Sequence, residues 1–589
     1  MVACWSSGKV PMQRHGRPSG KDELRAARKL SRGLYWAVGI FSFFANLLML
    51  TGPLYMLQVY DRVLGSRSEE TLIALSLLVV FLYGIMGLME FVRGRVMGRA
   101  GARFQSALDK RVFEAVSRKA ALAPDQKTES GLQDLESLRR LMTAPVLMAI
   151  FDMPWTPIFL AGIFIFHPLM GWLAVLGGSL LILITVFNQM LSRGPNLRSN
   201  MAEMQAGQMS GQMRTEAEML QSMGMEGAAY RRWNSARTRA LEEGISAADV
   251  GGGFSAMTKA LRLFLQSAML GLGAWLTLQG ELTPGAMIAG SILLGRALAP
   301  IELAVGQWAL VQRAAKGWEN LSELLDEVPP REQRTALPRP RARLEAKNLT
   351  VLPPGERQAS LKSLNFVLEP GQAMGVIGPS GCGKSTLARA ITGLWRPAGG
   401  SMRLDGAALD QYEPEVLGGL IGYLPQRVQL FDGTIAENIA RLADTPDDAK
   451  VVAAAKKAAA HQMILDLPNG YDTVIRDGQS RLSGGQIQRI GLARALYADP
   501  VIVVLDEPNS NLDNVGNQAL NQAIRQLKSE DRSVMIMAHR PNAIQECDTL
   551  LVMENGMRMA FGPKDEVLKA TVRNHKEVAA NPADKGGVV

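Results

Sequence analysis

The segment AMGVIGPSGCGKSTLARAI, residues 373–391, decides the fold of the second half of the chain. An apolar run that is typical of a buried strand leads into a glycine-rich turn, and a helical pattern begins at Lys384. The backbone N–H groups of such a turn and the positive end of the helix hold phosphate groups. Lys384 is placed to reach the β- and γ-phosphates of a nucleotide, and the Ser385 hydroxyl is placed to ligate Mg²⁺. The remaining candidate phosphate-binding residues are Gly378, Pro379, Ser380, Gly381, Cys382, Gly383 and Thr386.

A second segment, VIVVLDE at residues 501–507, supplies the acidic side chains that a nucleotide site needs. Its apolar residues predict a buried strand that ends at Asp506 and Glu507. Asp506 is placed to hold the Mg²⁺ shell, and Glu507 is placed to polarise the attacking water. Because short apolar strands alternate with helical segments throughout this half, the sequence predicts an α/β P-loop domain that binds ATP and Mg²⁺.

A third segment, LSGGQIQR at residues 482–489, is a glycine-rich turn that opens a helix, so it is also suited to binding phosphate. A single ATP site would then have two phosphate-binding turns about a hundred residues apart. The residues alone do not explain why one site would need two such turns. The candidate residues of this turn are Leu482, Ser483, Gly484, Gly485 and Gln486.

The first half of the chain contains long segments without any Asp, Glu, Lys or Arg. A helix needs roughly 20 residues to cross the ~30 Å hydrocarbon layer, so each segment is long enough to span a membrane. His167-Pro168 interrupts the longest segment and divides it into two spans. The sequence therefore predicts six spans. Five of them fall in the charge-free segments 33–60, 71–89, 153–192 (two spans) and 263–280, and the sixth falls in an apolar segment at about 284–312 that carries two charges.

The charges between these segments indicate the orientation of the chain. Residues 1–32 carry eight Lys and Arg, 90–142 carry eleven and 193–262 carry nine, whereas the first of the alternate connections carries only Arg62 and Arg67. Basic connections stay in the cytoplasm, so we expect the N-terminus, both long connections and the ATP-binding half to be cytoplasmic. Membrane topology thus accounts for the net charge of +9, and we expect no nucleic-acid partner.

The sixth predicted span carries Arg296 and Glu302. Charges inside a span are costly and tend to face a water-filled path, which makes both residues candidates for a translocation path. Arg296 is equally compatible with a position near the membrane edge, from which its long side chain would reach the headgroups.

Composition also divides the chain into domains. The two long cytoplasmic connections are rich in helix formers, so we expect them to extend the membrane helices into the cytoplasm. A Pro- and Arg-rich stretch follows the last span and is typical of a linker. The expected order is a cytoplasmic tail at 1–32, a transmembrane domain at 33–325, a linker at 326–343, a nucleotide-binding domain at 344–570 and a C-terminal tail at 571–589.

Six motifs occur together and in a characteristic order in the second half. They are GPSGCGKST, YLPQ with Gln426, LSGGQ at 482–486, LDEP, NLD at 511–513 and MAHR with His539. Over nearly the whole of 340–565, the chain resembles the nucleotide-binding domain of ABC transporters. In that family two domains pair head to tail, and each LSGGQ turn covers the γ-phosphate held by the other subunit. The resemblance thus implies a homodimer and accounts for the two phosphate-binding turns.

The same resemblance implies roles for four further side chains. Glu507 and His539 would be catalytic, with His539 contacting the γ-phosphate. Gln426 would contact Mg²⁺ and couple it to the membrane part, and Asp513 would bridge the two sites of the dimer. One position departs from the family pattern, because LTVLPPGERQ offers Val351 and Pro353 where the family usually has an aromatic residue that stacks on adenine.

The membrane half narrows the resemblance to one branch of the family. The segments PLYMLQVYDRVLGSRSEETL (53–72), FDMPWTPIFLAGIFIFHP (151–168) and AGSILLGRALAPIE (289–302) are similar to the permease/ATPase of bacterial type I secretion systems. This branch exports proteases, lipases and RTX-type proteins. The likeness implies an inner-membrane exporter that works with a periplasmic membrane-fusion adaptor and an outer-membrane channel. Its cargo would be unfolded protein with an uncleaved C-terminal signal.

Other functions stay open at this point. The nearest alternative is an ABC exporter of lipids or small molecules with the same architecture. A soluble ABC ATPase and a catalytically dead binding module are more distant alternatives, and the intact Lys384, Asp506, Glu507 and His539 count against the latter. Only 32 residues precede the first span, so we expect no N-terminal peptidase domain that trims cargo.

Overall fold

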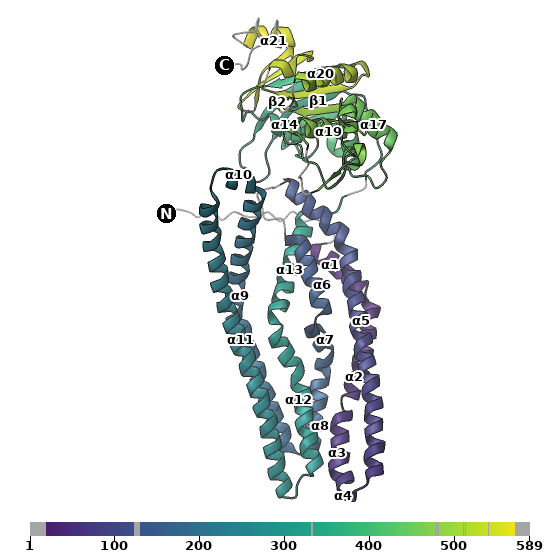
Figure 1. Ribbon diagram of the computed structural model, residues 1–589, viewed down its shortest axis with the longest axis vertical. Helices are drawn as coiled ribbons and strands as arrows, with labels where there is room; N and C mark the ends of the chain where they lie inside the picture. The colour runs from purple at the N-terminus through teal and green to yellow at the C-terminus, as the bar shows by residue number, and fades with distance from the viewer. Residues whose placement is uncertain are drawn as a thin grey trace. The chain divides into compact units, whose positions relative to one another are not determined.

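A computed structural model describes residues 19–122, 130–331, 334–476, 482–510, 512, 514–539 and 541–571. The chain divides into two compact units (Figure 1). One unit comprises Met1–Lys119 and Lys127–Pro330, and the other comprises Ala120–Gln126 and Arg331–Val589. Each unit is described by itself below.

The first unit is entirely helical in its described residues and contains six helices that are long and apolar enough to cross a membrane, as predicted. The third and fourth spans are separated at His167, whose extended backbone (φ −161°, ψ 137°) ends one helix and caps the next. The break expected at His167-Pro168 is therefore present. The six spanning stretches are Arg32–Ser66, Glu69–Leu122, Pro145–Phe166, Pro168–Thr215, Glu226–Leu278 and Pro284–Gly306.

Three of these helices are much longer than a bilayer requires. α5 (Glu69–Leu122), α9 (Pro168–Thr215) and α11 (Glu226–Leu278) have 54, 48 and 53 residues. At 1.5 Å per residue each is about 70–80 Å long, so more than half of each lies outside the hydrocarbon layer. α9 and α11 run side by side and are joined by the short helix α10 (Ala217–Ser222) (Figure 1). The long basic connections are therefore helical extensions of the spans.

Two apolar clusters hold the helices of this unit together. The first joins α8 (Thr156–Phe166), α9, α11 and α12 (Pro284–Gly306) around Phe159, Met170, Leu265 and Leu294. The second joins α1 (Gly20–Lys29), α5, α6 (Ser130–Thr143) and α13 (Trp308–Glu327) around Leu24, Phe104, Leu135 and Leu321. By contrast, the most apolar window of α5 has no buried residue, as expected for a helix face that meets lipid.

The connection after the first span is fixed to the start of the sixth. α2 (Arg32–Leu48) and α3 (Thr51–Gln58) lead into a π-helical turn, η1 (Val59–Val63), that carries Asp61. The Asp61 carboxylate accepts hydrogen bonds from the Thr283 hydroxyl (2.7 Å) and from the backbone N–H of Gly285 (2.8 Å). Because a carboxylate at a helix N-terminus satisfies free N–H groups and the helix dipole, this contact stabilises the start of α12.

The second unit is built on a six-stranded sheet in the order β12-β11-β3-β10-β9-β6. All neighbouring pairs are parallel except β11 with β12. Side chains alternate between two apolar cores, so that Val504 and Met535 face one core while Val503 and Ile536 face the other. The strands are β3 (Ala373–Ile377), β6 (Ile421–Leu424), β9 (Ile502–Asp506), β10 (Ser533–Ala538), β11 (Thr549–Glu554) and β12 (Met557–Pro563).

A smaller antiparallel sheet packs against one of these cores. It has the order β2-β1-β4-β5 and comprises β1 (Leu344–Val351), β2 (Leu361–Leu368), β4 (Gly399–Leu404) and β5 (Ala407–Ala408). The other core is covered by α17 (Asp448–Lys457), α19 (Gly484–Leu496) and α20 (Asn514–Ser529) (Figure 1). Since β3, β10 and β9 are parallel, their carboxyl ends meet at one edge of the large sheet, which is where α/β folds bind ligands.

Candidate active site

The glycine-rich turn lies where β3 ends and α14 (Lys384–Ile391) begins. Gly383 has a φ of 103°, in the left-handed region that favours glycine. A Cβ atom there would come within 2.7 Å of a Leu361 methyl group and 3.0 Å of the Ser360 carbonyl oxygen. Only glycine therefore lets the chain make this turn, which directs the first N–H groups of α14 toward a phosphate position.

Lys384 lies inside the turn rather than in solvent. Its side chain is buried, and its ammonium donates hydrogen bonds to the carbonyl oxygens of Gly378 (2.8 Å) and Pro379 (3.1 Å). The Sγ atom of buried Cys382 is 3.7 Å from the ammonium. This places a positive charge at the centre of the loop, and Cys382 acts as a small residue that fills space beneath it.

Asp506 ends β9 on the edge next to α14. The residue is 3 % exposed, and its carboxyl group forms a hydrogen bond with the Ser385 side chain. Burial raises the pKa of Asp506, the hydrogen bond from Ser385 opposes that rise, and the neighbouring Glu507 charge adds to it. Burying a carboxylate costs free energy unless a cation lies beside it. A carboxylate next to a hydroxyl offers the oxygen ligands that Mg²⁺ prefers. Ser385 and Asp506 therefore fit the metal that the sequence predicts.

Glu507 is held in an unusual backbone conformation directly after β9. Its φ is 51°, a left-handed value that is rare for residues other than glycine, and its N–H donates to the Met537 carbonyl oxygen (3.0 Å). Such a conformation costs about 1–3 kcal/mol and is found mostly at functional sites. The turn directs the Glu507 side chain along the nucleotide edge of the sheet.

The Glu507 carboxylate is contacted by two of the predicted site residues. Oε2 accepts a hydrogen bond from Gln426 Nε2 (2.9 Å), and Oε1 is 3.0 Å from His539 Nε2. The other ring nitrogen, Nδ1, lies 3.5 Å from the Lys384 ammonium. Because Lys384 only donates, Nδ1 acts as the acceptor, and this assigns the proton to Nε2, which donates to Glu507. The fold thus brings Lys384, Gln426, Glu507 and His539 into one chain of contacts.

The LSGGQ turn forms the N-terminus of α19. Ser483 Oγ accepts from the Gln486 N–H (3.3 Å), and Gln486 Oε1 accepts from the Ser483 N–H (2.7 Å), which is a capping box. This leaves the N–H groups of Gly484 and Gly485 at the start of the helix for an anion. Within the described residues, no hydrogen bond or ion pair joins this turn to the phosphate loop of the same chain.

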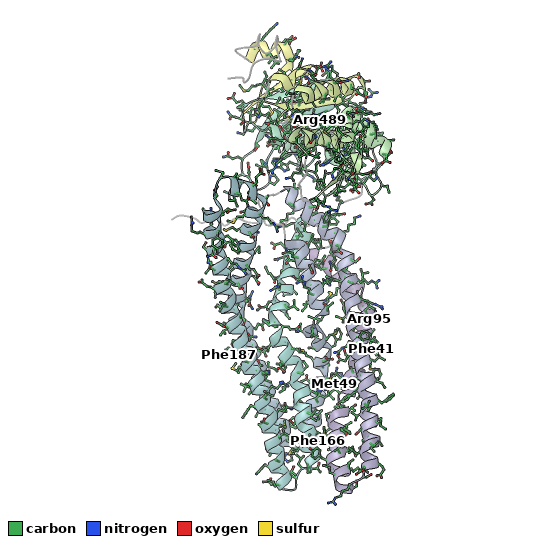
Figure 2. All side chains as sticks on the ribbon, in the orientation of Figure 1. Phe41, Met49, Arg95, Phe166, Phe187 and Arg489 are labelled. Carbon is green, nitrogen blue, oxygen red and sulfur yellow. The ribbon has the colours of Figure 1, made fainter. Side chains whose placement is uncertain are left out.

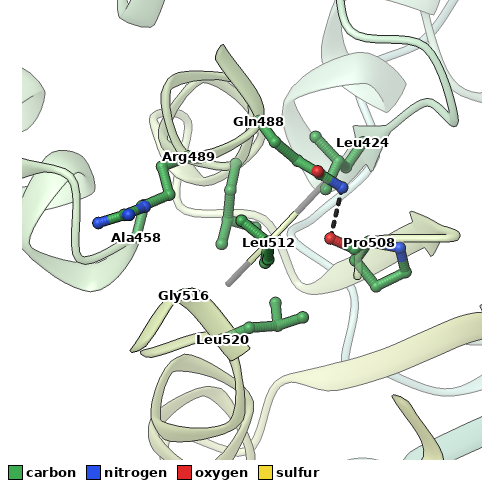
Figure 3. A pocket seen from close by; sticks show the side chains of 9 residues that line it. Leu424, Ala458, Gln488, Arg489, Pro508, Leu512, Gly516 and Leu520 are labelled. Atoms are coloured by element: carbon green, nitrogen blue, oxygen red, sulfur yellow. Dashed lines mark hydrogen bonds between the residues drawn. The ribbon is translucent and has the colours of Figure 1, made fainter. Parts of the chain in front are cut away.

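Gln488, which the sequence analysis did not single out, connects α19 to the catalytic loop. The residue is 3 % exposed, and its amide donates a hydrogen bond to the Pro508 carbonyl oxygen (Figure 3). The same amide lies 3.5 Å from the Glu507 carbonyl oxygen. The spacing of residues along α19 could have indicated this role. Gln488 is a polar residue that shares the helical spacing of buried Leu492 and Ala495, so it had to be buried with a partner.

Residues 351–353, where the family usually has an aromatic residue that stacks on adenine, differ in their exposure. Val351 and Pro353 are both buried, so neither offers a free face for a base, whereas Leu352 between them is 39 % exposed. Asp513, predicted to bridge the two sites, lies outside the described residues.

The two charged residues of the sixth span have different surroundings. Glu302 forms an ion pair with Arg262 of α11, with 3.0 Å between Oε2 and Nε. Arg296 lines a cavity in the membrane unit, and its guanidinium is 3.9 Å from the sulfur of Met49 (Met49 is labelled in Figure 2).

Six spanning stretches followed by a phosphate loop, a capped LSGGQ turn and a strained glutamate define an ABC transporter. Family models agree, because residues 35–298 match the ABC transporter transmembrane region and residues 361–510 match the ABC transporter domain. The fold is similar to that of a bacterial Atm1-family ABC exporter with ATP bound, with a TM-score of 0.82 at 23 % identity, covering 95 % of this chain and 99 % of that one.

Sequence relatives identify the branch. The chain is 44 % identical over 550 residues to the type I secretion system ATP-binding protein PrsD of Rhizobium meliloti (strain 1021), covering 93 % of this chain and 94 % of the relative. It is 26 % identical to the toxin RTX-I translocation ATP-binding protein of Actinobacillus pleuropneumoniae, over 92 % of this chain and 76 % of the relative. It is 27 % identical to the cyclolysin secretion/processing ATP-binding protein CyaB of Bordetella pertussis, over the same shares. The chain belongs to the type I secretion ATP-binding proteins, which are ATP-hydrolysing ABC transporters.

Proposed function

We propose that this chain exports polypeptides across the bacterial inner membrane as the permease/ATPase of a type I secretion system. The observation that carries the proposal is the 44 % identity to a type I secretion ATP-binding protein over 93 % of the chain. Relatives named for RTX toxin, leukotoxin and cyclolysin transport support protein cargo over the alternative of lipids or small molecules. The cargo would travel unfolded and carry an uncleaved C-terminal signal.

The partners and location follow from the same relationship. The exporter would work with a periplasmic membrane-fusion adaptor and an outer-membrane channel, and it would act as a homodimer. The long basic connections lie on the same side of the spans as the N-terminal segment and the ATPase unit. Because basic connections stay in the cytoplasm, both parts would be cytoplasmic.

The proposed mechanism assigns each residue at the sheet edge a role. Lys384 and the N–H groups of the phosphate loop hold the β- and γ-phosphates, and Leu352 packs against the adenine. Ser385, Asp506 and Gln426 would hold Mg²⁺, which when bound offsets the phosphate charge. Glu507 orients and polarises the attacking water, and His539 positions Glu507 and contacts the γ-phosphate.

Two features of the described site support this mechanism. The Glu507 carboxylate accepts a hydrogen bond from Gln426 and lies 3.0 Å from His539, so both side chains hold it at the edge of the sheet where the nucleotide would bind. Among the residues that the structure describes, no hydrogen bond or ion pair links the LSGGQ turn to the phosphate loop of its own chain, which supports its use by the partner subunit. Asp513, close in sequence to Glu507, would then bridge the two sites.

The experiment that tests export is a comparison of secreted proteins. A strain lacking this gene is complemented with the natural chain or with the Glu507→Gln variant, and culture supernatants are compared by mass spectrometry. We expect one or a few proteins to appear only with the natural chain. If the supernatant proteins are identical in all strains while a lipid or small molecule disappears, export of protein is wrong.

A further inference from the structure

A cavity of about 430 Å³ lies in the membrane unit, and four ionisable side chains form part of its wall. They are Glu90 and Arg93 of α5, Asp152 of α7 (Pro145–Asp152) and Arg296 of α12. Glu90 and Asp152 each adjoin a charge-free segment, so the cavity lies at the cytoplasmic ends of the spans. A polypeptide that enters the spans from the cytoplasm would pass this level of the membrane unit.

Three of these four groups satisfy one another. Asp152 Oδ1 accepts from Arg93 Nη1 (2.8 Å) and from Asn46 Nδ2 (2.6 Å), and Arg93 Nη2 is 3.3 Å from Glu90 Oε1. Arg93 also donates to the Ser42 hydroxyl (3.1 Å). The network ties α2, α5 and α7 together, and both Arg93 and Asp152 already have charged and neutral partners within it.

Arg296 differs because no carboxylate pairs with it among the residues that the structure describes. Its only polar-atom contact there is the weak one to the Met49 sulfur, although a guanidinium has five N–H donors. Glu302, on the same helix, is engaged by Arg262. A charge at membrane depth is costly unless it has a partner or a function.

We propose that Arg296 binds a carboxylate of the polypeptide in transit, either an acidic side chain or the free C-terminus. The inference rests on the proposed export function and names the chemistry that its pathway recognises. A guanidinium binds a carboxylate through two parallel charge-assisted hydrogen bonds, and the mixed polar and apolar wall accommodates an extended peptide segment. Cations are disfavoured as ligands, because both carboxylates of the cavity already contact Arg93.

The test uses the full-length chain in detergent and four rhodamine-labelled decapeptides of Gly, Ser and Asn. One peptide has a single Asp and an amidated end, one has a free C-terminus, one is neutral and one has a single Lys. Fluorescence anisotropy measures each Kd. We expect both carboxylate peptides to bind roughly tenfold more tightly than the neutral and Lys peptides, which is the scale of a charge-assisted hydrogen bond.

Variants then identify the residue. Arg296→Gln should abolish the preference, and Arg296→Lys should retain part of it. Arg95→Gln, which removes an exposed guanidinium of α5 outside the cavity (Arg95 is labelled in Figure 2), should retain all of it. Equal binding of all four peptides, or a preference that survives Arg296→Gln, overturns the carboxylate site and leaves export intact. Failure of every peptide to bind counts against both proposals.

Discussion

The side-chain amide of Gln488 donates a hydrogen bond to the carbonyl oxygen of Pro508. Gln488 lies on the helix that begins at the LSGGQ turn, and Pro508 directly follows the strained Glu507. One buried contact thus joins the turn that would serve the partner's nucleotide to the glutamate that would act on this subunit's own nucleotide. In a head-to-tail dimer, movement of α19 would reach Glu507 through this bond.

Replacing Gln488 should therefore slow hydrolysis more than it weakens ATP binding. Gln488→Leu keeps the size of the side chain but removes the donor, leaving the Pro508 carbonyl without its partner at a cost of about 1–3 kcal/mol. We expect kcat to fall about tenfold or more with KM for ATP changed less than threefold, because the phosphate loop is untouched. Steady-state ATPase kinetics measure both. Gln462→Leu, on an exposed helix position, is the control, and a change confined to KM contradicts the positioning role.

Removing the Glu507 carboxylate should separate binding from turnover. Glu507→Gln keeps the hydrogen-bonding shape of the side chain but cannot polarise water, so hydrolysis should fall by about 10²–10⁴-fold. The affinity for ATP should stay within a few fold of the natural chain, and the ATP-bound dimer should persist on size-exclusion chromatography. Undiminished steady-state hydrolysis would show that another group acts on the water.

The sequence predicted those parts of the site that depend on local pattern. The phosphate loop, the strand ending at Asp506 and the break at His167 are each set by adjacent residues, so motif and periodicity located them. Contacts between segments that are distant in the sequence could not be predicted from motif or periodicity. Nothing near Glu302 in the sequence indicates that it pairs with Arg262, because the two residues lie on different helices and 40 positions apart.

The burial of individual side chains was the second feature that the sequence did not predict. The sequence showed that no aromatic residue stands near Val351 and Pro353 to stack on adenine, but it did not indicate that these two residues are buried while Leu352 between them is exposed. Asp152 lies one residue before a charge-free segment, and nothing in the adjacent sequence indicates that it pairs with Arg93 of α5. Strand ends and helix neighbours are set by tertiary packing, which a single sequence does not reveal.

The Arg93–Asp152 pair should be necessary for the stability of the membrane unit. Asp152→Leu would remove the shorter of the two carboxylate contacts of the buried Arg93 guanidinium and leave the 3.3 Å contact with Glu90, and breaking a buried pair from one side costs up to about 3–5 kcal/mol. Thermal unfolding in detergent should occur at a clearly lower temperature. The double variant Arg93→Met/Asp152→Leu removes both charges and should recover much of the loss. A double variant less stable than the single one would mean that the two residues act independently.

Cys547 should resist thiol reagents in the folded chain. Burial raises the pKa of its thiol to about 12, so at pH 8 only about one molecule in ten thousand carries the reactive thiolate. We expect almost no iodoacetamide labelling of Cys547 at pH 8 by mass spectrometry, and rapid labelling after unfolding in guanidinium chloride, where the thiol returns to its ordinary pKa. Fast labelling of the native chain would contradict the burial of this residue.

Mixing two inactive variants should restore activity if each ATP site is shared between subunits. Lys384→Ala removes the phosphate-binding ammonium, and Ser483→Arg blocks the LSGGQ turn, so each homodimer should be inactive. In a mixed dimer, the phosphate loop of the Ser483→Arg chain meets the intact turn of the Lys384→Ala chain, which rebuilds one complete site. After the two chains are co-expressed with different affinity tags and purified through both, ATPase activity should return to a substantial fraction of that of the natural dimer. A site completed within one chain would leave the mixed dimer inactive, because each subunit would still carry its own defect.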